Sequence, residues 1–266
     1  MSGGIPHDRV LSVAISPSDR SGGRSVVYAG TEPSNVYRSE DDGRTWRPST
    51  ALRELPSATS WSFPPRPWTS HVRWIALSPT DPGLVFAGIE LGGVMRSGDG
   101  GETWEDHNPG ACLGAHALAT HRREGARVYQ AAGDGVAMSA DAGDSWRRAD
   151  EGMDRHYAWG LAVDPADPDL WYVSASHGPR VAHRDERSAE AILYRRRGDG
   201  PWEALDGGLP SPLPHMPYAL VAPRERPGSV IAGLRSGELL ASDDAGDSWR
   251  PLPVRLPKVL ALAEAA

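Results

Sequence analysis

Short apolar runs recur along the chain, and turn residues separate them. Five of these runs open similar stretches of sequence, at residues 10–17, 72–79, 115–121, 159–165 and 218–223. Each leads through a turn of Pro, Asp or Gly into a second short run, and a third and a fourth run follow. Apolar runs rich in β-branched residues and separated by such turns predict strands joined in hairpins and meanders. No stretch has clear helical periodicity, so we expect an all-β chain.

One pattern, Ser-x-Asp-x-Gly-x-x-Trp, stands at the same place in four of these units. The complete copies are Ser39-Asp41-Gly43-Trp46, Ser97-Asp99-Gly101-Trp104, Ser139-Asp141-Gly143-Trp146 and Ser242-Asp244-Gly246-Trp249, and a degraded fifth copy ends at Trp202. The tryptophans follow one another at intervals of 42 to 58 residues, close to the ~40–50 residues of a four-stranded propeller blade. We expect the Ser and Asp to cap turn amides, the Gly to supply a positive φ and the Trp to pack on the blade.

The pattern resembles the Asp-box, or BNR, repeat of sialidase-like propellers, sortilin-type receptors, some glucanases and the photosystem II assembly factor family. Other segments, such as GTEPSNVYRSEDDGRTW, resemble uncharacterised bacterial Asp-box proteins often labelled glycosyl hydrolase or exo-sialidase. The resemblance implies a β-propeller of four-stranded blades, with the boxes at the blade periphery in a structural role. It does not imply one function, because unrelated functions share this fold.

The repeats set the expected boundaries. We expect a single propeller domain over residues 1–266, with complete blades at about 9–50, 71–108, 114–150, 156–206 and 215–254. Residues 258–266 match the opening of an inner strand and have no blade behind them, so they predict an orphan inner strand. Propellers usually close by completing one blade from both termini. The sequence leaves open how this propeller closes and whether the chain starts late relative to its relatives.

Composition narrows the classes of function. The 266 residues hold 28 Lys and Arg against 35 Asp and Glu, a net charge of −7. This charge argues against non-specific nucleic-acid or anionic-membrane binding, which needs a basic patch. The single Cys112 excludes an internal disulfide framework and a Cys-cluster zinc site. No apolar run approaches the ~20 residues of a membrane span, and no secretory signal is visible, so we expect a soluble cytoplasmic protein.

The candidate site residues stand where the inner strands begin and in the loops between second and third strands, which meet at the ligand face of a propeller. The predicted ligand-binding residues are His71, Arg73, His116, His156, Trp159, His177, Arg180, His183 and His215. Converging imidazoles can bind one divalent metal, for which His71, His116 and His215 are the candidate ligands. Two alternatives stay open: each His hydrogen-bonds a neighbouring blade or water, or it contacts a ligand without metal.

Glu90 and Tyr157 are the candidate catalytic residues. Glu90 is a candidate general base, and Glu32, Glu90 and Asp134 are the only plausible pair-forming carboxylates for glycoside hydrolysis. The sialidase resemblance implies an Arg triad that grips a carboxylate and a Tyr nucleophile paired with Glu, roles for which Arg73, Arg180 and Tyr157 or Tyr218 are candidates. The chain lacks a recognisable Arg-Ile-Pro motif, which argues against true sialidase activity.

Two insertions distinguish the chain from a bare scaffold. Residues 51–70 carry two Trp, one Phe and four Pro, and residues 177–190 are rich in Arg and His. Each insertion can form the rim of a pocket, or it can simply be a covering or solvated loop.

We therefore expect a propeller with a polar central site, rich in His and Arg, that binds or hydrolyses a small polar ligand, sugar-like or anionic. If the protein is an enzyme, we expect a hydrolase, glycosidase-like or metal-dependent. The alternative is a non-enzymatic scaffold for protein interaction or assembly, so a protein partner stays open. We expect neither a nucleic-acid nor a membrane partner.

Overall fold

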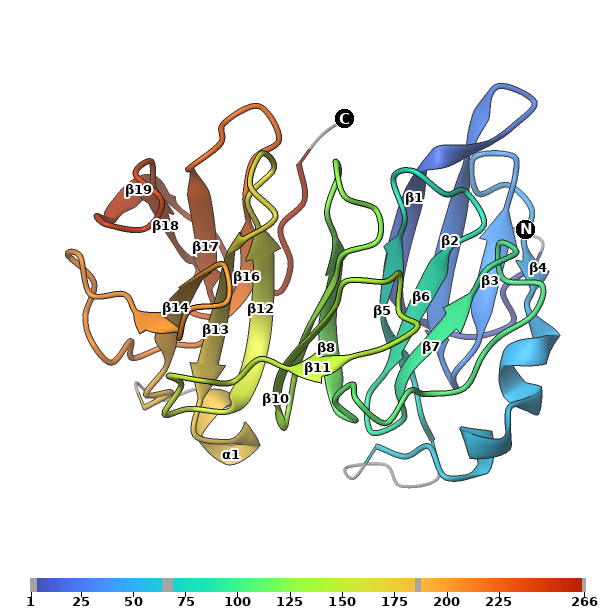
Figure 1. Cartoon of the computed structure of the whole chain (residues 1–266), viewed down its shortest axis with the longest axis horizontal. Coiled ribbons are helices and arrows are strands. Elements are labelled where there is room, and N and C mark those ends of the chain that lie inside the picture. The colour runs from blue at the N-terminus through green and yellow to red at the C-terminus, as the bar shows by residue number, and fades with distance from the viewer. Residues whose placement is uncertain (1–3, 64–68, 185–187, 265–266) are drawn as a thin grey trace. The chain divides into compact units, whose positions relative to one another are not determined.

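The computed structural model describes residues 4–63, 69–184 and 188–264, and there the chain forms five antiparallel sheets (Figure 1). Within each sheet the strands are neighbours in the order in which they occur in the sequence, which is the meander that the turn-separated runs predict. The chain divides into two compact units, and each is described by itself. Unit 1 comprises residues 1–130 and 137–148, and unit 2 comprises residues 131–136 and 149–266.

Three sheets, called blades 1 to 3, follow one another in the first half of the chain. Blade 1 holds β1 (Arg9–Ser21), β2 (Arg24–Glu32), β3 (Val36–Ser39) and β4 (Arg47–Pro48). Two 3₁₀ turns, η1 (Thr50–Glu54) and η2 (Pro56–Thr59), come next. Blade 2 holds β5 (Val72–Leu77), β6 (Val85–Ile89) and β7 (Gly93–Ser97), and blade 3 holds β8 (Ala115–Thr120), β9 (Val128–Ala132), β10 (Gly135–Ser139) and β11 (Arg147–Arg148).

Two further sheets make up blades 4 and 5. Blade 4 holds β12 (Tyr157–Val163), β13 (Leu170–Ser176), β14 (Ile192–Arg197) and β15 (Glu203–Ala204), with the short helix α1 (Pro179–Ala182) between β13 and β14. Blade 5 holds β16 (Pro217–Val221), β17 (Val230–Leu234), β18 (Glu238–Ser242) and β19 (Arg250–Arg255). The strands follow the five repeats in the sequence.

Blade 2 differs from the predicted four strands. It has three strands and a single isolated bridge between Arg96 and Glu105 where a fourth strand was expected. Side chains explain the difference: the imidazole of His107 accepts the backbone N–H of Val94 at 3.3 Å, and Asp106 accepts hydrogen bonds from Ser57 and from the His107 amide. These contacts take the place of a backbone ladder after the first bridge.

The predicted orphan strand at 258–266 also differs. Its described part, residues 258–264, has no strand assignment. It contributes apolar side chains instead, because Val259 is 4% exposed and packs with Ala219 and Leu239 of blade 5. Gly233 permits this approach, since a Cβ there would lie 2.5 Å from Cγ1 of Val259.

The four complete boxes share one set of hydrogen bonds. In each, the Ser hydroxyl accepts the N–H of the box glycine at 2.8 or 2.9 Å, and the Asp carboxylate accepts the backbone N–H four residues after it at 2.8 or 2.9 Å. The box glycines have φ between 80° and 92°, a left-handed conformation that strains other residues. These are the turn contacts that the box composition leads one to expect.

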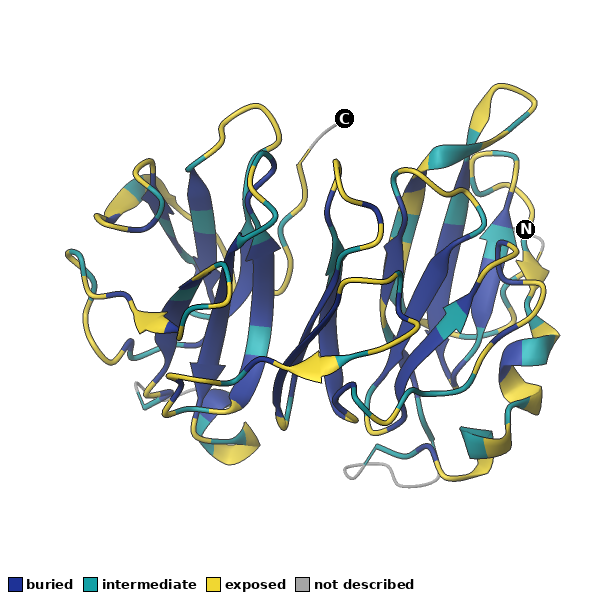
Figure 2. Cartoon of the chain, in the orientation of Figure 1, coloured by how far each residue is buried: buried dark blue, intermediate teal, exposed yellow. Residues whose placement is uncertain are grey.

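Apolar packing joins the blades within each unit, and the strand centres are the most buried parts of the chain (Figure 2). In unit 1 one cluster joins blades 1 and 2 through residues such as Val26, Val72 and Ile89, and another joins blades 2 and 3 through Phe86 and Leu118. In unit 2 the largest cluster joins blades 4 and 5. Among the described residues, no helix is long and apolar enough to span a membrane.

Candidate functional site

Four predicted positions meet at one end of the blades of unit 1, and we call Glu32, His71, Glu90 and His116 the Glu90 cluster. Glu32 ends β2, His71 directly precedes β5 and Glu90 directly follows β6. Because Val72 and Ile89 are register partners on β5 and β6, His71 and Glu90 leave the ladder side by side. His116 lies in β8 of blade 3. The strand ends of three consecutive blades thus contribute to one polar group.

Glu90 holds this cluster together. Its Oε2 lies 2.9 Å from His71 Nε2, and its Oε1 lies 3.8 Å from His116 Nε2. The side chains of the two histidines are only 5% and 2% exposed, whereas that of Glu90 is 15% exposed. The imidazoles are therefore fixed in the protein, and the carboxylate is the member of the cluster that reaches solvent.

The cluster controls the ionisation of Glu90. Burial by itself would raise the pKa of this carboxyl, but the facing imidazoles of His116 and His71 lower it by more. The pKa of Glu90 consequently lies well below its usual range, and the group is a carboxylate at neutral pH.

Glu32 forms the second acidic side of the cluster. It is the register partner of Arg9 across β1 and β2, and its Oε2 lies 3.4 Å from Arg9 Nε. The same oxygen is 3.8 Å from His71 Nδ1, a buried atom without a hydrogen-bond partner in the described part of the chain. The Phe63 ring meets the His71 ring edge-on, with centroids 4.8 Å apart.

Unit 2 has its own group at the corresponding strand ends, and we call Tyr157, Trp159, His183, Tyr218 and Arg235 the His183 cluster. His183 follows α1, and both of its ring nitrogens are engaged: Nε2 lies 2.7 Å from the Tyr157 hydroxyl and Nδ1 lies 2.7 Å from the Tyr218 hydroxyl. Arg235 donates to the Tyr218 oxygen at 2.7 Å and to the His183 carbonyl at 2.6 Å. The Trp159 ring lies against His183, with centroids 4.7 Å apart.

These contacts give His183 a structural role. A histidine with both nitrogens bonded to tyrosines offers no ring nitrogen to a metal or ligand. Because Tyr157 lies on β12 and Tyr218 on β16, the two bonds hold the segment after α1 against these strands. The Tyr157 hydroxyl is likewise engaged with an imidazole, whereas the sialidase resemblance implied a glutamate partner.

The remaining predicted residues lie outside these two clusters. His156, His177 and Arg180 are exposed in unit 2, and His177 Nε2 lies 3.4 Å from Glu190 Oε2. His215, also in unit 2, is partly buried, and Arg73 of β5 is partly buried in unit 1. Of the two insertions, residues 64–68 and 185–187, including Arg66, lie outside the described residues.

The metal hypothesis gains no support from the geometry. In the described ranges, no three side chains of His, Cys, Asp or Glu are grouped so as to hold a metal ion. His71 Nε2 faces Glu90 at 2.9 Å, and His215 belongs to the other unit. A site on His71, His116 and His215 remains a prediction from the sequence alone.

Sequence reasoning did not find two contacts of these clusters, the packing of Phe63 on His71 and the bond from Arg235 to Tyr218. Phe63 comes from an insertion without a repeat partner, so no alignment of the units could place it on His71. Arg235 stands in the predicted loop after β17, but its bond to Tyr218 depends on a side-chain conformation that no pattern encodes.

Comparison with solved structures identifies the fold. An ancestral GH74 enzyme matches with a TM-score of 0.69 and 18% identity, over 93% of this chain and 33% of that chain. The GH74 xyloglucanase from Xanthomonas campestris matches with a TM-score of 0.66 and 18% identity, over 91% of this chain and 38% of that chain. YCF48 bound to D1 peptide matches with a TM-score of 0.60 and 12% identity, over 93% of this chain and 70% of that chain.

These likenesses show a β-propeller fold, as the repeats predicted. The chain spans between 33% and 38% of the length of these two GH74 proteins. Its sequence matches no protein-family model and no curated protein.

Proposed function

We propose that unit 1 binds a small, neutral, hydroxyl-rich ligand at the Glu90 cluster and does not hydrolyse it. The observation that carries this proposal is the pairing of Glu90 with two nearly buried histidines, which holds a partly exposed carboxylate in its ionised form. An ionised carboxylate only accepts hydrogen bonds. It is therefore suited to the hydroxyl groups of a sugar-like ligand.

The lowered pKa of Glu90 argues against a hydrolytic role. A general acid or base works best with a pKa near the pH at which the protein operates. The histidines hold the pKa of Glu90 far below neutrality, so Glu90 is a poor proton donor and a weak base there. Binding needs neither property.

The local charge favours a neutral ligand over an anion. Glu32 and Glu90 place two carboxylates in the cluster, and Arg9 is paired with Glu32 at 3.4 Å. An anionic ligand would approach both carboxylates, which disfavours it by like-charge repulsion. Hydroxyl groups can instead donate to Glu90, whose carboxylate is partly exposed.

A ligand screen tests the proposal. By its name, the GH74 xyloglucanase with a similar fold acts on xyloglucan, so xyloglucan oligosaccharides are the first probes. Glucuronate-containing oligosaccharides serve as the anionic comparison, and saturation-transfer NMR reports binding. We expect neutral oligosaccharides to bind and the Glu90→Gln variant to bind at least about 10-fold more weakly, because a charged acceptor is lost.

Glu102→Gln is the matched control, since it neutralises an exposed carboxylate of the second Asp-box that pairs with Arg47 at the surface of unit 1. We expect it to bind as the wild type does. Equal binding by Glu90→Gln and wild type, or a preference for the anionic probes, would contradict the proposal.

Binding of a protein partner is the second candidate, and one observation favours it. β1 is an edge strand of its sheet, and Val13 and Ile15 on it are 63% and 66% exposed. Residues two apart on a strand share a face, so the two form an exposed apolar strip. YCF48, whose fold is similar, has been solved with a D1 peptide. Loss of a stoichiometric partner from purified complexes of a Val13→Thr/Ile15→Thr variant would favour this candidate.

A further inference from the structure

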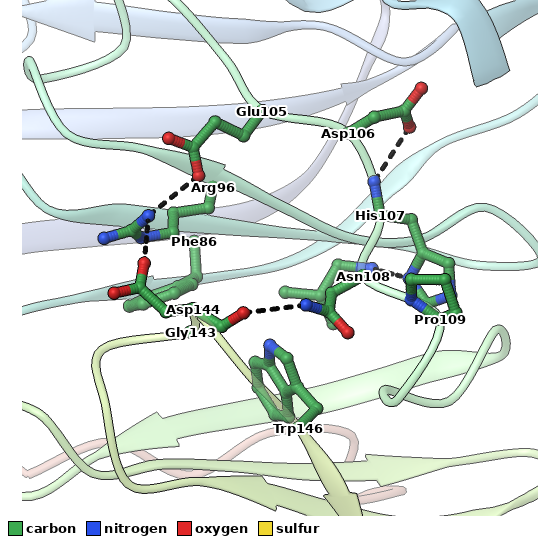
Figure 3. A pocket seen from close by; sticks show the side chains of 11 residues that line it. Phe86, Arg96, Glu105, Asp106, His107, Asn108, Pro109, Gly143, Asp144 and Trp146 are labelled. Carbon is green, nitrogen blue, oxygen red and sulfur yellow. Dashed lines mark hydrogen bonds and ion pairs between the residues drawn. The ribbon is translucent and has the colours of Figure 1, made fainter.

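A polar pocket lies at the side of blade 2 in unit 1, apart from the residues of the Glu90 cluster. It has a volume of about 350 Å³ and is formed by β6, β7, residues 105–109 and the third Asp-box (Figure 3). This volume is at the lower end of the range of small-molecule sites, roughly 300–1,000 Å³. The pocket is therefore large enough for a small ring-shaped ligand.

Trp146 of the third box differs here from the other box tryptophans. Each of the other four donates its indole N–H to an oxygen of the protein at 2.6 to 3.1 Å. The pairs are Trp46 with Gly43 O, Trp104 with Ser49 Oγ, Trp202 with Ala149 O, and Trp249 with Gly246 O. Within the described residues, the indole N–H of Trp146 has no such partner. Figure 3 shows its nitrogen turned toward the pocket, beside Gly143 and Asn108. The repeat thus supplies an indole N–H as a hydrogen-bond donor, and among the five boxes only that of Trp146 is available to a ligand.

Acceptors stand opposite this donor. Arg96 Nη1 lies 2.8 Å from Glu105 Oε2 and 2.8 Å from Asp144 Oδ1, so one guanidinium holds two carboxylates in place. The carboxylate side chains are 67% and 65% exposed, and each has one further oxygen that Arg96 does not bind. Figure 3 shows Arg96 between them.

The charges of the lining select the class of ligand. Glu105, Asp106 and Asp144 outnumber Arg96, which disfavours an anion. The single guanidinium of Arg96 balances only one of its two carboxylate partners, but an ammonium group has no lone pair with which to accept the indole N–H of Trp146. A neutral polyol meets neither difficulty, because its hydroxyls donate to the carboxylates and accept from the indole N–H.

The geometry points to this pocket as a second binding site, which takes one neutral sugar ring with Trp146 as donor and Glu105 and Asp144 as acceptors. The site shares no residue with the Glu90 cluster, and the inference does not depend on the function proposed for that cluster. It also gives the third Asp-box a binding role in addition to its turn.

Indole NMR on the full chain tests the site directly. Each of the ten tryptophans contributes one indole N–H signal, and the Trp146→Phe variant identifies the signal of Trp146. The probes are glucose, glucuronate and glucosamine, which are neutral, anionic and cationic versions of one ring. We expect glucose to shift the Trp146 signal with a Kd on the order of millimolar, because few groups make contact. Glucuronate should bind about 10-fold more weakly.

Internal controls make the result specific. The Trp249 signal should not move, since its N–H is bonded to Gly246 O. Glu105→Gln should weaken the glucose response about 10-fold, whereas Glu102→Gln, at an exposed carboxylate outside the pocket lining, should leave it unchanged. If Trp146→Phe does not fold, the test is whether Glu105→Gln loses the glucose-induced shift of an indole signal. No shift of any indole signal up to about 100 mM glucose, a range that covers weak sites, would overturn the inference, as would tighter binding of glucosamine than of glucose.

Discussion

At the scale of single residues, local hydrogen bonds explain what could be predicted and long-range contacts explain what could not. The box contacts join residues at most four apart, so the sequence contains all their partners. Trp46 and Trp104 stand in similar boxes, yet Trp46 bonds its own box glycine whereas Trp104 donates to Ser49, 55 residues away. That difference depends on neighbours brought in by tertiary structure, and no reading of the repeat could have found it.

Asp244 gives the residue-scale prediction. Hydrogen bonds from the Ser248 hydroxyl and amide and from Ser242 lower the pKa of this carboxyl from 3.8 to about 2. A lowered folded-state pKa contributes stability above the unfolded value, and the contribution is lost as the pH falls toward the folded value. The difference in melting temperature between wild type and Asp244→Asn should therefore be full above about pH 5 and shrink below about pH 4. Thermal denaturation followed by circular dichroism measures it.

Asp206→Asn is the control for this series, because Asp206 is exposed and outside the boxes. Its melting temperature should stay close to that of the wild type at every pH. An Asp244→Asn difference that grows on acidification would show that the carboxylate hydrogen bonds do not stabilise the box.

At the scale of elements, the repeats place the strands correctly, and the exceptions come from side chains that replace backbone partners. The His107 imidazole accepts the Val94 amide N–H, which limits the fourth strand of blade 2 to one bridge. The same repeats bring His71 and Glu90 together, because the start of β5 and the end of β6 are register neighbours. The alignment of units predicted the positions at this end of the blades, whereas the pairing of Glu90 with two histidines depends on packing between blades.

The packing of blade 1 on blade 2 gives the element-scale prediction. A Cβ at Gly30 of β2 would lie 2.3 Å from Ser12 Oγ and 2.6 Å from Val72 Cγ1. Gly30→Ala should therefore force the two sheets apart and lower the free energy of unfolding by about 1–3 kcal/mol. Chemical denaturation measures the change.

Gly98→Ala is the matched control in the same unit, since a Cβ there meets no atom within 4 Å. It should change the free energy of unfolding by less than about 0.5 kcal/mol. Equal effects of the two substitutions would mean that the close approach of the blades does not determine stability.

At the scale of the whole molecule, the chain is a set of similar blades on which different chemistry has been placed. Unit 1 holds a carboxylate between two histidines, and unit 2 holds a histidine between two tyrosines. The sequence predicted the propeller fold because five repeats point to it. It did not predict which cluster serves which role, because residues where inner strands begin, such as His71 and Tyr157, acquire different partners in different blades.

The central claim is that the Glu90 cluster binds a neutral hydroxyl-rich ligand without cleaving it. One proton NMR experiment with a xyloglucan oligosaccharide tests both parts, since it reports saturation transfer and the anomeric signals of the same sample. We predict saturation transfer that is weaker in the Glu90→Gln variant, and anomeric signals that stay constant during prolonged incubation. New reducing-end signals formed by the wild type and absent with Glu90→Gln, or no saturation transfer at all, would contradict the claim.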